Sequence, residues 1–486
     1  MKRQPSLSFL CLGFLVLTST LSSIALSAER PNILFLFTDD QAPWAFGRSG
    51  DPNANTPNLD KLASQGAYLT RSFTVTPVCS PSRISLMTSR YGTEVGITDW
   101  IKPKDRFFKD NPEEQPGIDP AMPNLAKTLS GAGYETALIG KYHIGERPEC
   151  HPTKVGFDYF MGFLDGGTTP DNPKLEKDGQ YQPFQGLTVD IFTEHALEFL
   201  AKKHESPFFL AVHFRSPHAK WLPVAPEDWA PFESMDPELS NPDYPGLDVE
   251  RAKQMMREYL ASVRGVDRNV GRILAKLDEL KLSENTIIIY SADHGYNMGH
   301  NGIWHKGNGH WLLKKEALPP ATENIPTGQR PNLYDNSVLI PTLVRWPGVI
   351  EEGTVIDQTV SNLDWFPTFA DLAGADIPAG LRGHSIVPLL KGDAPVDWEN
   401  EIFLQYSTKH QSHTHMRGWR SNHYKLIRDF LNPERDEFYD LEADPGENTN
   451  LIGELTGEQK AVAADFDAKL RARMKEIDDP ALELAH

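Results

Sequence analysis

Several uninterrupted apolar runs in this chain have the length of a buried β-strand, and polar residues follow each one. The clearest runs span Asn32 to Phe37, Pro207 to Phe214 and Asn285 to Ala292. Strands that are apolar throughout are typical of parallel sheets that helices cover on both faces. Such folds bind their ligands at the carboxyl ends of the strands. The residues after each run are therefore the first candidates for chemistry.

Segments with helical patterns alternate with these runs. Thr56 and Pro57 suit the N-cap and first position of a helix whose leucines follow at helical spacing, and Gly66 ends it. Further helices are predicted over residues 125–129, 188–203 and 249–282, and further strands over residues 67–74 and 134–139. This order predicts an α/β fold, in which helices flank a large doubly wound mixed sheet.

The composition changes over residues 391–399, and short strands alternate with turns beyond this point before a helix over residues 458–477. We therefore predict a signal peptide over residues 1–28, a catalytic domain over 29–392, and a smaller C-terminal α+β subdomain over 393–486 with an antiparallel sheet and a helix. Residues 100–117, 226–245 and 311–330 are rich in proline or charge and are predicted to be irregular, the last as a loop on the substrate side.

The first residues have the pattern of a secretory signal. Lys2 and Arg3 precede an apolar run that ends at the small residues Ser27 and Ala28. This pattern predicts a cleaved signal peptide, and an uncleaved signal anchor is the alternative. We expect a periplasmic or secreted protein that has no membrane anchor after cleavage.

Acidic residues outnumber basic ones, and the formal net charge is −19. Removal of Lys2 and Arg3 with the signal peptide lowers it by 2, to −21. So acidic a surface argues against nucleic acid as a partner. An anionic substrate would have to be attracted by a local cluster of cations.

Two adjacent carboxylates, Asp39 and Asp40, follow the first apolar run. They repel each other unless a cation lies between them, so they are candidates for a divalent metal site. A helix N-cap pair or simple turn acids are the alternative. Asp293 and His294 follow the run that ends at Ala292 in the same way.

The segment Cys79-Ser80-Pro81-Ser82-Arg83 is the candidate nucleophile site. Pro81 fits the first turn of a helix, so Cys79 lies just before or at a helix N-terminus, where an anion is favoured. Arg83, about one turn later, can direct its guanidinium to the same point. The alternative is a structural cysteine, either buried or paired with Cys150, the other cysteine outside the predicted signal peptide.

Other basic residues follow predicted strands. In an extended stretch Lys141 and His143 would leave on one face, suited to bind an anion and transfer a proton. A solvated loop is the alternative. His218 stands in a proline turn after the apolar run Pro207 to Phe214, whereas His213 lies inside that run and is predicted to be a core histidine.

These motifs together resemble those of the type I sulfatases, a family of the alkaline phosphatase-like superfamily. The pentapeptide at 79–83 resembles the family's modification signature Cys-x-Pro-x-Arg, and residues 140–145 resemble Gly-Lys-x-His-x-Gly. The likeness continues through Asp293-His294-Gly295, through a segment that ends at Lys306, and through a C-terminal hallmark over residues 438–448. It covers residues 31–451.

The resemblance implies a mechanism. Cys79 would be oxidised to formylglycine (3-oxoalanine) by a formylglycine-generating or anaerobic sulfatase-maturating enzyme, and its hydrate would attack sulfur. One Ca²⁺ would be held by Asp39, Asp40, Asp293, the modified Cys79 and His294, although His294 could instead bond the substrate. Arg83, Lys141 and Lys306 would be the cations that bind the sulfate. His218 would be the acid that protonates the leaving group, with Lys306 as its helper or rival. His143 would accept the proton of the hydrate.

The substrate expected from this resemblance is a sulfated sugar of a glycosaminoglycan or algal polysaccharide. Residues near the motifs are candidates for sugar binding, namely Trp100, Arg215, Trp304, His305 and His310; Trp44, Trp221 and Trp311 could stack on sugar rings or belong to the core. Two other functions stay open from the sequence. One is a phosphoester or phosphonate hydrolase of the same superfamily, and the other is a non-catalytic protein that binds sulfated glycans.

Overall fold

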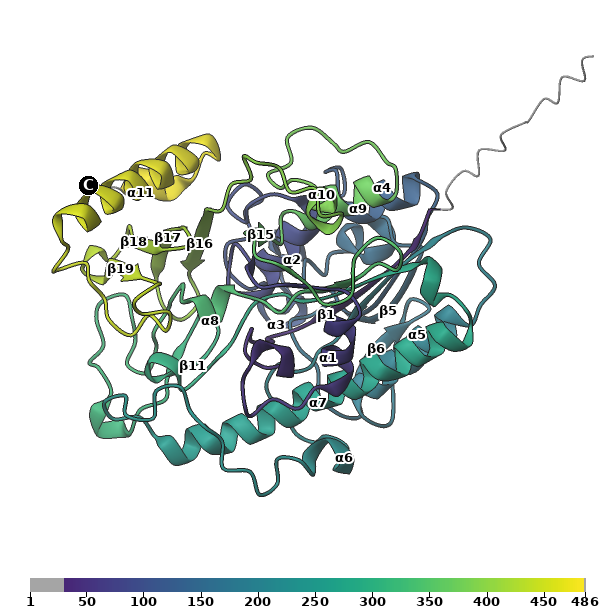
Figure 1. Cartoon of the computed structure of the whole chain (residues 1–486), viewed down its shortest axis with the longest axis horizontal. Helices are drawn as coiled ribbons and strands as arrows, with labels where there is room; N and C mark the ends of the chain where they lie inside the picture. The colour runs from purple at the N-terminus through teal and green to yellow at the C-terminus, as the bar shows by residue number, and fades with distance from the viewer. Residues whose placement is uncertain (1–29, 485–486) are drawn as a thin grey trace, which may run out of the picture.

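The computed structural model describes residues 30–484, so the predicted signal peptide lies outside the described residues. A sheet of ten strands forms the centre of the large domain (Figure 1). Its strands are, in spatial order, β14 (Thr354–Ile356), β2 (Ala67–Leu69), β13 (Leu343–Arg345), β9 (Thr286–Ala292), β1 (Asn32–Thr38), β8 (Phe208–His213), β4 (Glu135–Lys141), β5 (Tyr159–Phe163), β6 (Lys174–Lys177) and β7 (Gln180–Pro183).

The strands from β9 to β5 in this order are parallel, whereas β13 and β6 pair with the outer ones of them in antiparallel fashion. The sheet is therefore mixed, as predicted. None of the described helices is both long enough and apolar enough to cross a membrane.

Helices cover both faces of the sheet because alternate residues of each central strand point to opposite sides. Phe35 and Phe37 of β1 pack with one group of helices, α2 (Cys79–Thr88), α4 (Leu125–Gly131), α9 (Trp365–Leu372) and α10 (Val387–Leu390). Leu34 and Leu36 pack with the other group, α1 (Pro57–Ser64), α5 (Thr188–Leu200) and the long α7 (Val249–Glu279). Figure 1 shows α7 running along one side of the molecule.

The single strand predicted over residues 67–74 is wrong. The chain forms β2 and then β3 (Ser72–Phe73), which pairs with β15 (Val360–Ser361) in a separate sheet. The partner changes between them because Thr70 donates its N–H to Ile356 while Arg71 accepts from Val360. This change of partner leads the chain towards Cys79. Two segments predicted as irregular contain short helices, α3 (Lys104–Phe107) and α6 (Pro226–Trp229).

A four-stranded antiparallel sheet and a helix form the C-terminal part, as predicted (Figure 1). The strands are β16 (Ile402–Thr408), β17 (Thr414–Arg420), β18 (Tyr424–Asp429) and β19 (Glu437–Asp440), and the helix is α11 (Gly457–Glu476). Thr456 and Gln459 form a capping box at the start of α11, and Phe466, Leu470 and Met474 pack it against the sheet. The boundary at residue 392 stays a prediction.

A buried network of charges joins this part to the large domain. Asp335, on α8 (Asp335–Val338), accepts hydrogen bonds from Arg420 and from Lys425, whose Nζ lies 2.8 Å from Oδ1. The Lys425 Nζ also lies 2.6 Å from Oε1 of Glu447, within the C-terminal hallmark. Lys425 is fully buried, so both carboxylates depend on it for charge balance.

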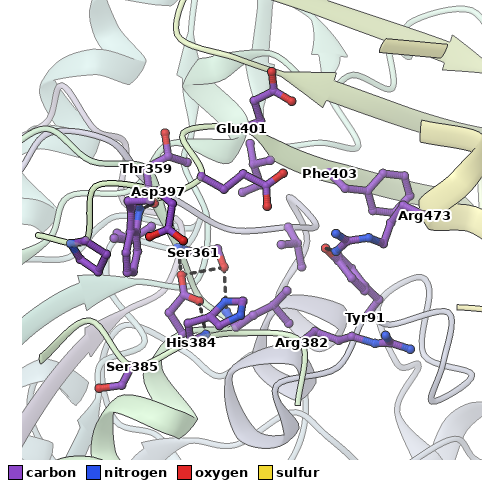
Figure 2. Close-up of a pocket in the computed structure, with 18 of the residues that line it drawn as sticks. Tyr91, Thr359, Ser361, Arg382, His384, Ser385, Asp397, Glu401, Phe403 and Arg473 are labelled. Carbon is purple, nitrogen blue, oxygen red and sulfur yellow. Dashed lines mark hydrogen bonds between the residues drawn. The ribbon is translucent and has the colours of Figure 1, made fainter. Parts of the chain in front are cut away.

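A cavity of about 460 Å³ also lies between the two parts (Figure 2). Arg382, Glu401 and Arg473 line it together with Thr359 and His384. No residue predicted for catalysis or metal binding lines it, so the candidate site lies elsewhere.

We predict that Lys425→Met lowers the free energy of unfolding by about 3–5 kcal/mol, because it leaves Asp335 and Glu447 buried with less compensating charge. Urea denaturation measures this loss. Lys469→Met is the matched control, since Lys469 pairs with Glu401 at a partly exposed position and its loss costs about 0–1 kcal/mol. Equal losses in the two variants would contradict the role given to the network.

Candidate active site

Four neighbouring parallel strands, β9, β1, β8 and β4, deliver the candidate residues at one edge of the sheet. Asp293 follows β9, Asp39 and Asp40 follow β1, His218 follows β8, and Lys141 is the last residue of β4. Because the carboxyl ends of parallel strands share one edge, these side chains meet although the sequence separates them widely.

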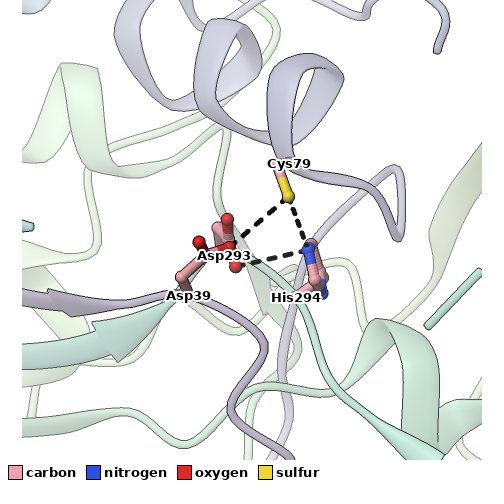
Figure 3. Close-up of side chains that lie close together, drawn as sticks. All are labelled: Asp39, Cys79, Asp293 and His294. Carbon is pink, nitrogen blue, oxygen red and sulfur yellow. Dashed lines mark hydrogen bonds and ion pairs between the residues drawn. The ribbon is translucent and has the colours of Figure 1, made fainter. Parts of the chain in front are cut away.

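Cys79 is the first residue of α2, and its N-cap residue Val78 is extended. Its Sγ lies 3.0 Å from the Lys306 Nζ and 3.4 Å both from Asp39 Oδ1 and from His294 Nε2. Figure 3 shows Cys79 facing Asp39, Asp293 and His294 from the start of this helix. The predicted nucleophile thus lies over the predicted metal site, at the positive end of a helix dipole. Cys79 and Cys150 are both free thiols.

The donor atoms of Asp39, Cys79, Asp293 and His294 all lie within 4.8 Å of one another, and those of Asp39, Asp40, Cys79 and His218 form a second such group. The Asp40 Oδ2 is buried and has no hydrogen-bond partner. Converging carboxylate oxygens of this kind suit a hard divalent cation such as Ca²⁺. The residues present therefore fit the ion that the resemblance implies.

The orientation of His294 bears on its role. Its Nδ1 lies 3.0 Å from the carbonyl oxygen of Gly295, which can only accept, so Nδ1 carries the proton. Burial lowers the pKa of His294 well below the usual value, so the ring is neutral and Nε2 bears a lone pair. That Nε2 lies 3.2 Å from Asp40 Oδ1 and 3.4 Å from Asp293 Oδ1. The lone pair of His294 Nε2 therefore faces those of two carboxylate oxygens. This arrangement favours a cation shared by the three residues over a hydrogen bond from His294 to the substrate.

Three cationic side chains balance the three carboxylates. The Lys141 Nζ lies 2.6 Å from Asp39 Oδ2, the Lys306 Nζ lies 2.6 Å from Asp40 Oδ1, and the Arg83 Nη2 lies 2.9 Å from Asp293 Oδ2. All six are buried. A divalent ion added to this balanced set would give the site a net positive charge, which is the local attraction that an acidic protein needs to bind an anion.

The pKa values of the three acids differ. Burial opposes ionisation of Asp39, but Lys141 and other nearby cations hold its pKa well below the usual value. Burial raises the pKa of Asp40 to about 7 despite Lys306, and burial with the charge of Asp39 raises that of Asp293 to about 6. Without a further cation, the three carboxylates are therefore not all ionised at moderately acidic pH.

Two histidines face this cluster. His218 places Nδ1 2.6 Å from the carbonyl oxygen of Ala219, and one of its ring nitrogens is part of the second group of donor atoms. The extended stretch predicted around His143 is wrong at that residue, whose φ of 58° turns the chain. His143 nevertheless lies near Lys141, with Nε2 3.0 Å from the Ile101 carbonyl oxygen and a buried Nδ1 that has no partner. Burial lowers the pKa of both well below the usual value, so both are neutral.

His213 is a core residue. Its Nδ1 lies 3.1 Å from the Lys141 carbonyl oxygen, and its ring packs against Phe35 and Phe37. This agrees with its predicted place inside the apolar strand.

The residues predicted for substrate binding fall into two places. Trp304 lies against the rings of His305 and His310, at 5.2 and 5.5 Å between centroids, next to Lys306. Trp100 instead packs on His410 in the loop between β16 and β17, at 4.7 Å. The C-terminal part thus reaches the segment whose Ile101 contacts His143. The packing of Trp100 on His410 could not be expected from the sequence.

Arg215 lies near the cluster, but its guanidinium already bonds the chain. It donates to the carbonyl oxygens of Thr168 and Lys220 and is buried, and burial lowers its pKa to about 10. Its first role is to hold the loop that carries His218.

Two supporting residues were not identified from the sequence. Asn332 donates to the carbonyl oxygen of Lys306 at 3.1 Å and so fixes the backbone of that lysine. Tyr296, which directly follows Asp293-His294-Gly295, is fully buried beside the cluster. Its position next to a predicted metal ligand was the signal that could have identified it, whereas Asn332 has no local signal.

Comparisons with known proteins agree with this geometry. The profile of the family Sulfatase matches residues 31–375, and one described as N-sulphoglucosamine sulphohydrolase, C-terminal, matches residues 329–477. The chain is 27% identical over 537 residues to an N-acetylglucosamine-6-O-sulfatase of Bacteroides thetaiotaomicron, covering 93% of this chain and 88% of that protein. It is 28% identical over 468 residues to an ulvan-active sulfatase of Formosa agariphila, covering 93% and 82%.

A solved structure of a protein in complex with its substrate D-glucosamine-2-N,6-O-disulfate has the same fold, with a TM-score of 0.78. It is 25% identical to this chain, and the match covers 93% of this chain and 99% of that one.

We predict that the unmodified Cys79 thiol reacts very slowly with iodoacetamide in the folded protein. Burial, with the charge of Asp39, raises its pKa from 9.0 to about 12, which lowers the thiolate fraction about 10³-fold near neutral pH. The rate should rise about tenfold per pH unit well beyond pH 9. Mass spectrometry of the peptide that contains residue 79 measures it, with urea-unfolded protein as control. Equal rates in the folded and unfolded chain would contradict the neutral, buried thiol.

Proposed function

Because the chain belongs to the sulfatase family, we propose that this enzyme removes sulfate from a sulfated carbohydrate, a glycosaminoglycan or algal polysaccharide fragment. The relatives named above act on an amino-sugar sulfate and on ulvan. The observation that carries the proposal is the balanced set of three carboxylates and three cations around Cys79. An added cation together with an anionic substrate would make use of that set.

We propose that Asp39, Asp40, Asp293 and His294 hold one Ca²⁺ beside residue 79, and that Cys79 is converted to formylglycine. Bound there, the ion would polarise the hydrated aldehyde and the sulfate oxygens, and the hydrate would supply the attacking hydroxyl. The neutral thiol of the unmodified residue is poorly suited to attack, because its pKa is raised to about 12. Modification would require a formylglycine-generating or anaerobic sulfatase-maturating enzyme.

Arg83, Lys141 and Lys306 are the proposed binding residues for the sulfate. Each now pairs with one carboxylate at 2.6–2.9 Å. A bound Ca²⁺ would take a share of the carboxylate charge, and Arg83, Lys141 and Lys306 would then be free to bond the sulfate oxygens. These cations are buried, so little water would screen their attraction to the negative charge that develops in the transition state.

Proton transfer is assigned to the neutral histidines His218 and His143 rather than to Lys306. Burial opposes the charge of Lys306, but Asp40 and its neighbours raise its pKa far above the usual value, so it serves best as a fixed cation. Burial lowers the pKa of His218 in the ligand-free protein. The negative charge of a bound sulfate would raise this pKa towards 7, so that the ring could carry a proton. His218 is therefore the proposed acid for the leaving oxygen. His143, with its unpartnered Nδ1, is the proposed acceptor of the hydrate's proton.

The proposed location is the periplasm or the outside of the cell, and it rests on the sequence pattern of residues 1–28. The sugar expected there would be a fragment of an external polysaccharide.

The central experiment expresses the chain with a formylglycine-generating enzyme. We expect the mass of the peptide containing residue 79 to change from thiol to aldehyde, and we expect the purified protein to release sulfate from N-acetylglucosamine-6-sulfate or ulvan oligosaccharides. Cys79→Ala should release none. A fully converted protein that cleaves phosphate or phosphonate esters but no sugar sulfate would contradict the proposal.

The metal is tested on the same preparation. Dialysis against a chelator should abolish sulfate release, and Ca²⁺ should restore it better than Mg²⁺, which requires a stricter octahedral geometry. Ca²⁺ should also raise the thermal midpoint, since binding at about 100 times Kd stabilises by about 2.7 kcal/mol. Full activity after exhaustive removal of metal would contradict the assigned site.

A comparison of leaving groups distinguishes the roles of His218 and Lys306. We predict that His218→Gln lowers kcat on a sugar sulfate by about 10²–10⁴-fold, because an alkoxide leaves only with a proton. The loss on 4-nitrophenyl sulfate should be far smaller, since nitrophenolate leaves unprotonated. Lys306→Met should impair both substrates, because it removes a sulfate-binding cation. A loss for His218→Gln that is equal on both substrates would show that it is not the acid.

A further inference from the structure

A cluster of aromatic rings adjoins the metal site on the side of α7. Tyr296 stacks on Tyr259 with ring centroids 5.2 Å apart and planes 11° apart. The ring of Trp221 meets both edge-on, at 6.1 and 6.5 Å, and lies 6.4 Å from the ring of Trp304. The cluster therefore extends from the residues beside the metal site to Trp304, which lies next to Lys306.

The two stacked tyrosines differ in what their hydroxyl groups do. The Tyr259 hydroxyl donates to the carbonyl oxygen of Asp40 at 2.8 Å and accepts from the N–H of Ala42 at 2.8 Å. It fixes the turn after β1 and is fully used. The Tyr296 hydroxyl is equally buried and has no hydrogen-bond partner.

A second donor close by is also unpaired. The Nε1 of Trp221 has no partner although the residue is only 7% exposed. Folded proteins pair nearly all such buried groups, so two adjacent orphans need a reason. The neighbouring Trp44 shows the usual case, because its Nε1 donates to the carbonyl oxygen of Tyr296.

The surroundings limit what the two orphans can bind. Asp40, Asp39 and Arg215 are charged groups that act on Tyr296, and the rings of Trp304, His305 and His310 adjoin the aromatic cluster. Both orphan groups are neutral donors, and the nearest acids would repel a second anion. They suit an uncharged oxygen acceptor, such as a hydroxyl or an acetamido carbonyl, on a sugar whose sulfate lies over residue 79.

We propose that Tyr296 and Trp221 are specificity-determining residues that donate hydrogen bonds to uncharged oxygens of the sugar beside the scissile sulfate. The proposal rests on the proposed function and adds a recognition element to the same site. A site built to bond such an oxygen discriminates against substrates that lack it, because its donors are then left buried and unpaired.

The test compares two variants that each lose one hydroxyl group. Tyr296→Phe removes an unpaired hydroxyl, whereas Tyr259→Phe removes one that makes two hydrogen bonds. Two quantities are measured, the thermal midpoint and the ratio of kcat/KM on a sugar sulfate to kcat/KM on 4-nitrophenyl sulfate, which has no sugar oxygens. We expect Tyr296→Phe to keep or raise the midpoint and to lower the ratio about tenfold. Tyr259→Phe should lower the midpoint and leave the ratio unchanged. Trp221→Phe should lower the ratio in the same direction as Tyr296→Phe.

The outcomes separate this proposal from the proposed function. A wild-type enzyme with no activity on any sulfate ester contradicts the function itself. An active wild-type enzyme whose ratio is unchanged in Tyr296→Phe and in Trp221→Phe overturns the specificity role. Equal losses on both substrates overturn it as well, because they would place Tyr296 in support of the metal site.

Discussion

The convergence of three buried carboxylates on one point is the constraint on which the rest of the site depends. Asp39, Asp40 and Asp293 are fully buried, and like charges at such a depth repel strongly. The fold compensates with one cation for each acid, at 2.6–2.9 Å. The parallel strands are what make this convergence possible, since their carboxyl ends deliver acids from β1 and β9 beside a lysine from β4. A site of this kind would gain its net positive charge from an added metal ion rather than from an excess of basic residues, which would reconcile the proposed binding of an anion with a chain of net charge −19.

The C-terminal part supports this site through a short path. Lys425 and Arg420 hold Asp335, whose N–H donates to Glu447. Asp335 lies three residues after Asn332, which bonds the carbonyl oxygen of Lys306. The buried network of the C-terminal hallmark therefore fixes the backbone of a lysine that contacts both Asp40 and Cys79. The two parts form one working unit for this reason, and the loop with His410 adds a second contact near Trp100.

The sequence was most informative where a short pattern ends at a defined structural position. Asp39 and Asp293 follow apolar runs, and the end of such a run is also the end of a parallel strand, so their place was predictable. The break between β2 and β3 was not, because it depends on which partner strand supplies hydrogen bonds on each side of Thr70. The left-handed turn at His143, the support of Lys306 by Asn332 and the packing of Trp100 on His410 were hidden for the same reason. Each arises from residues that are distant in sequence, and no periodicity records them.

The burial of Cys79 bears on when its proposed modification could take place. The side chain is 2% exposed, and every residue of α2 from Cys79 to Thr88 is buried. An enzyme that oxidises this cysteine would have to reach the thiol, and in the folded chain the thiol and the flanking residues of α2 are covered. The thiol is also neutral there, since its pKa is raised to about 12, so the fold protects it from reagents that need a thiolate. The proposed conversion of Cys79 would therefore have to precede the formation of α2 and of the sheet edge that α2 covers. The close packing that places residue 79 over the carboxylates would thus require modification to come before folding.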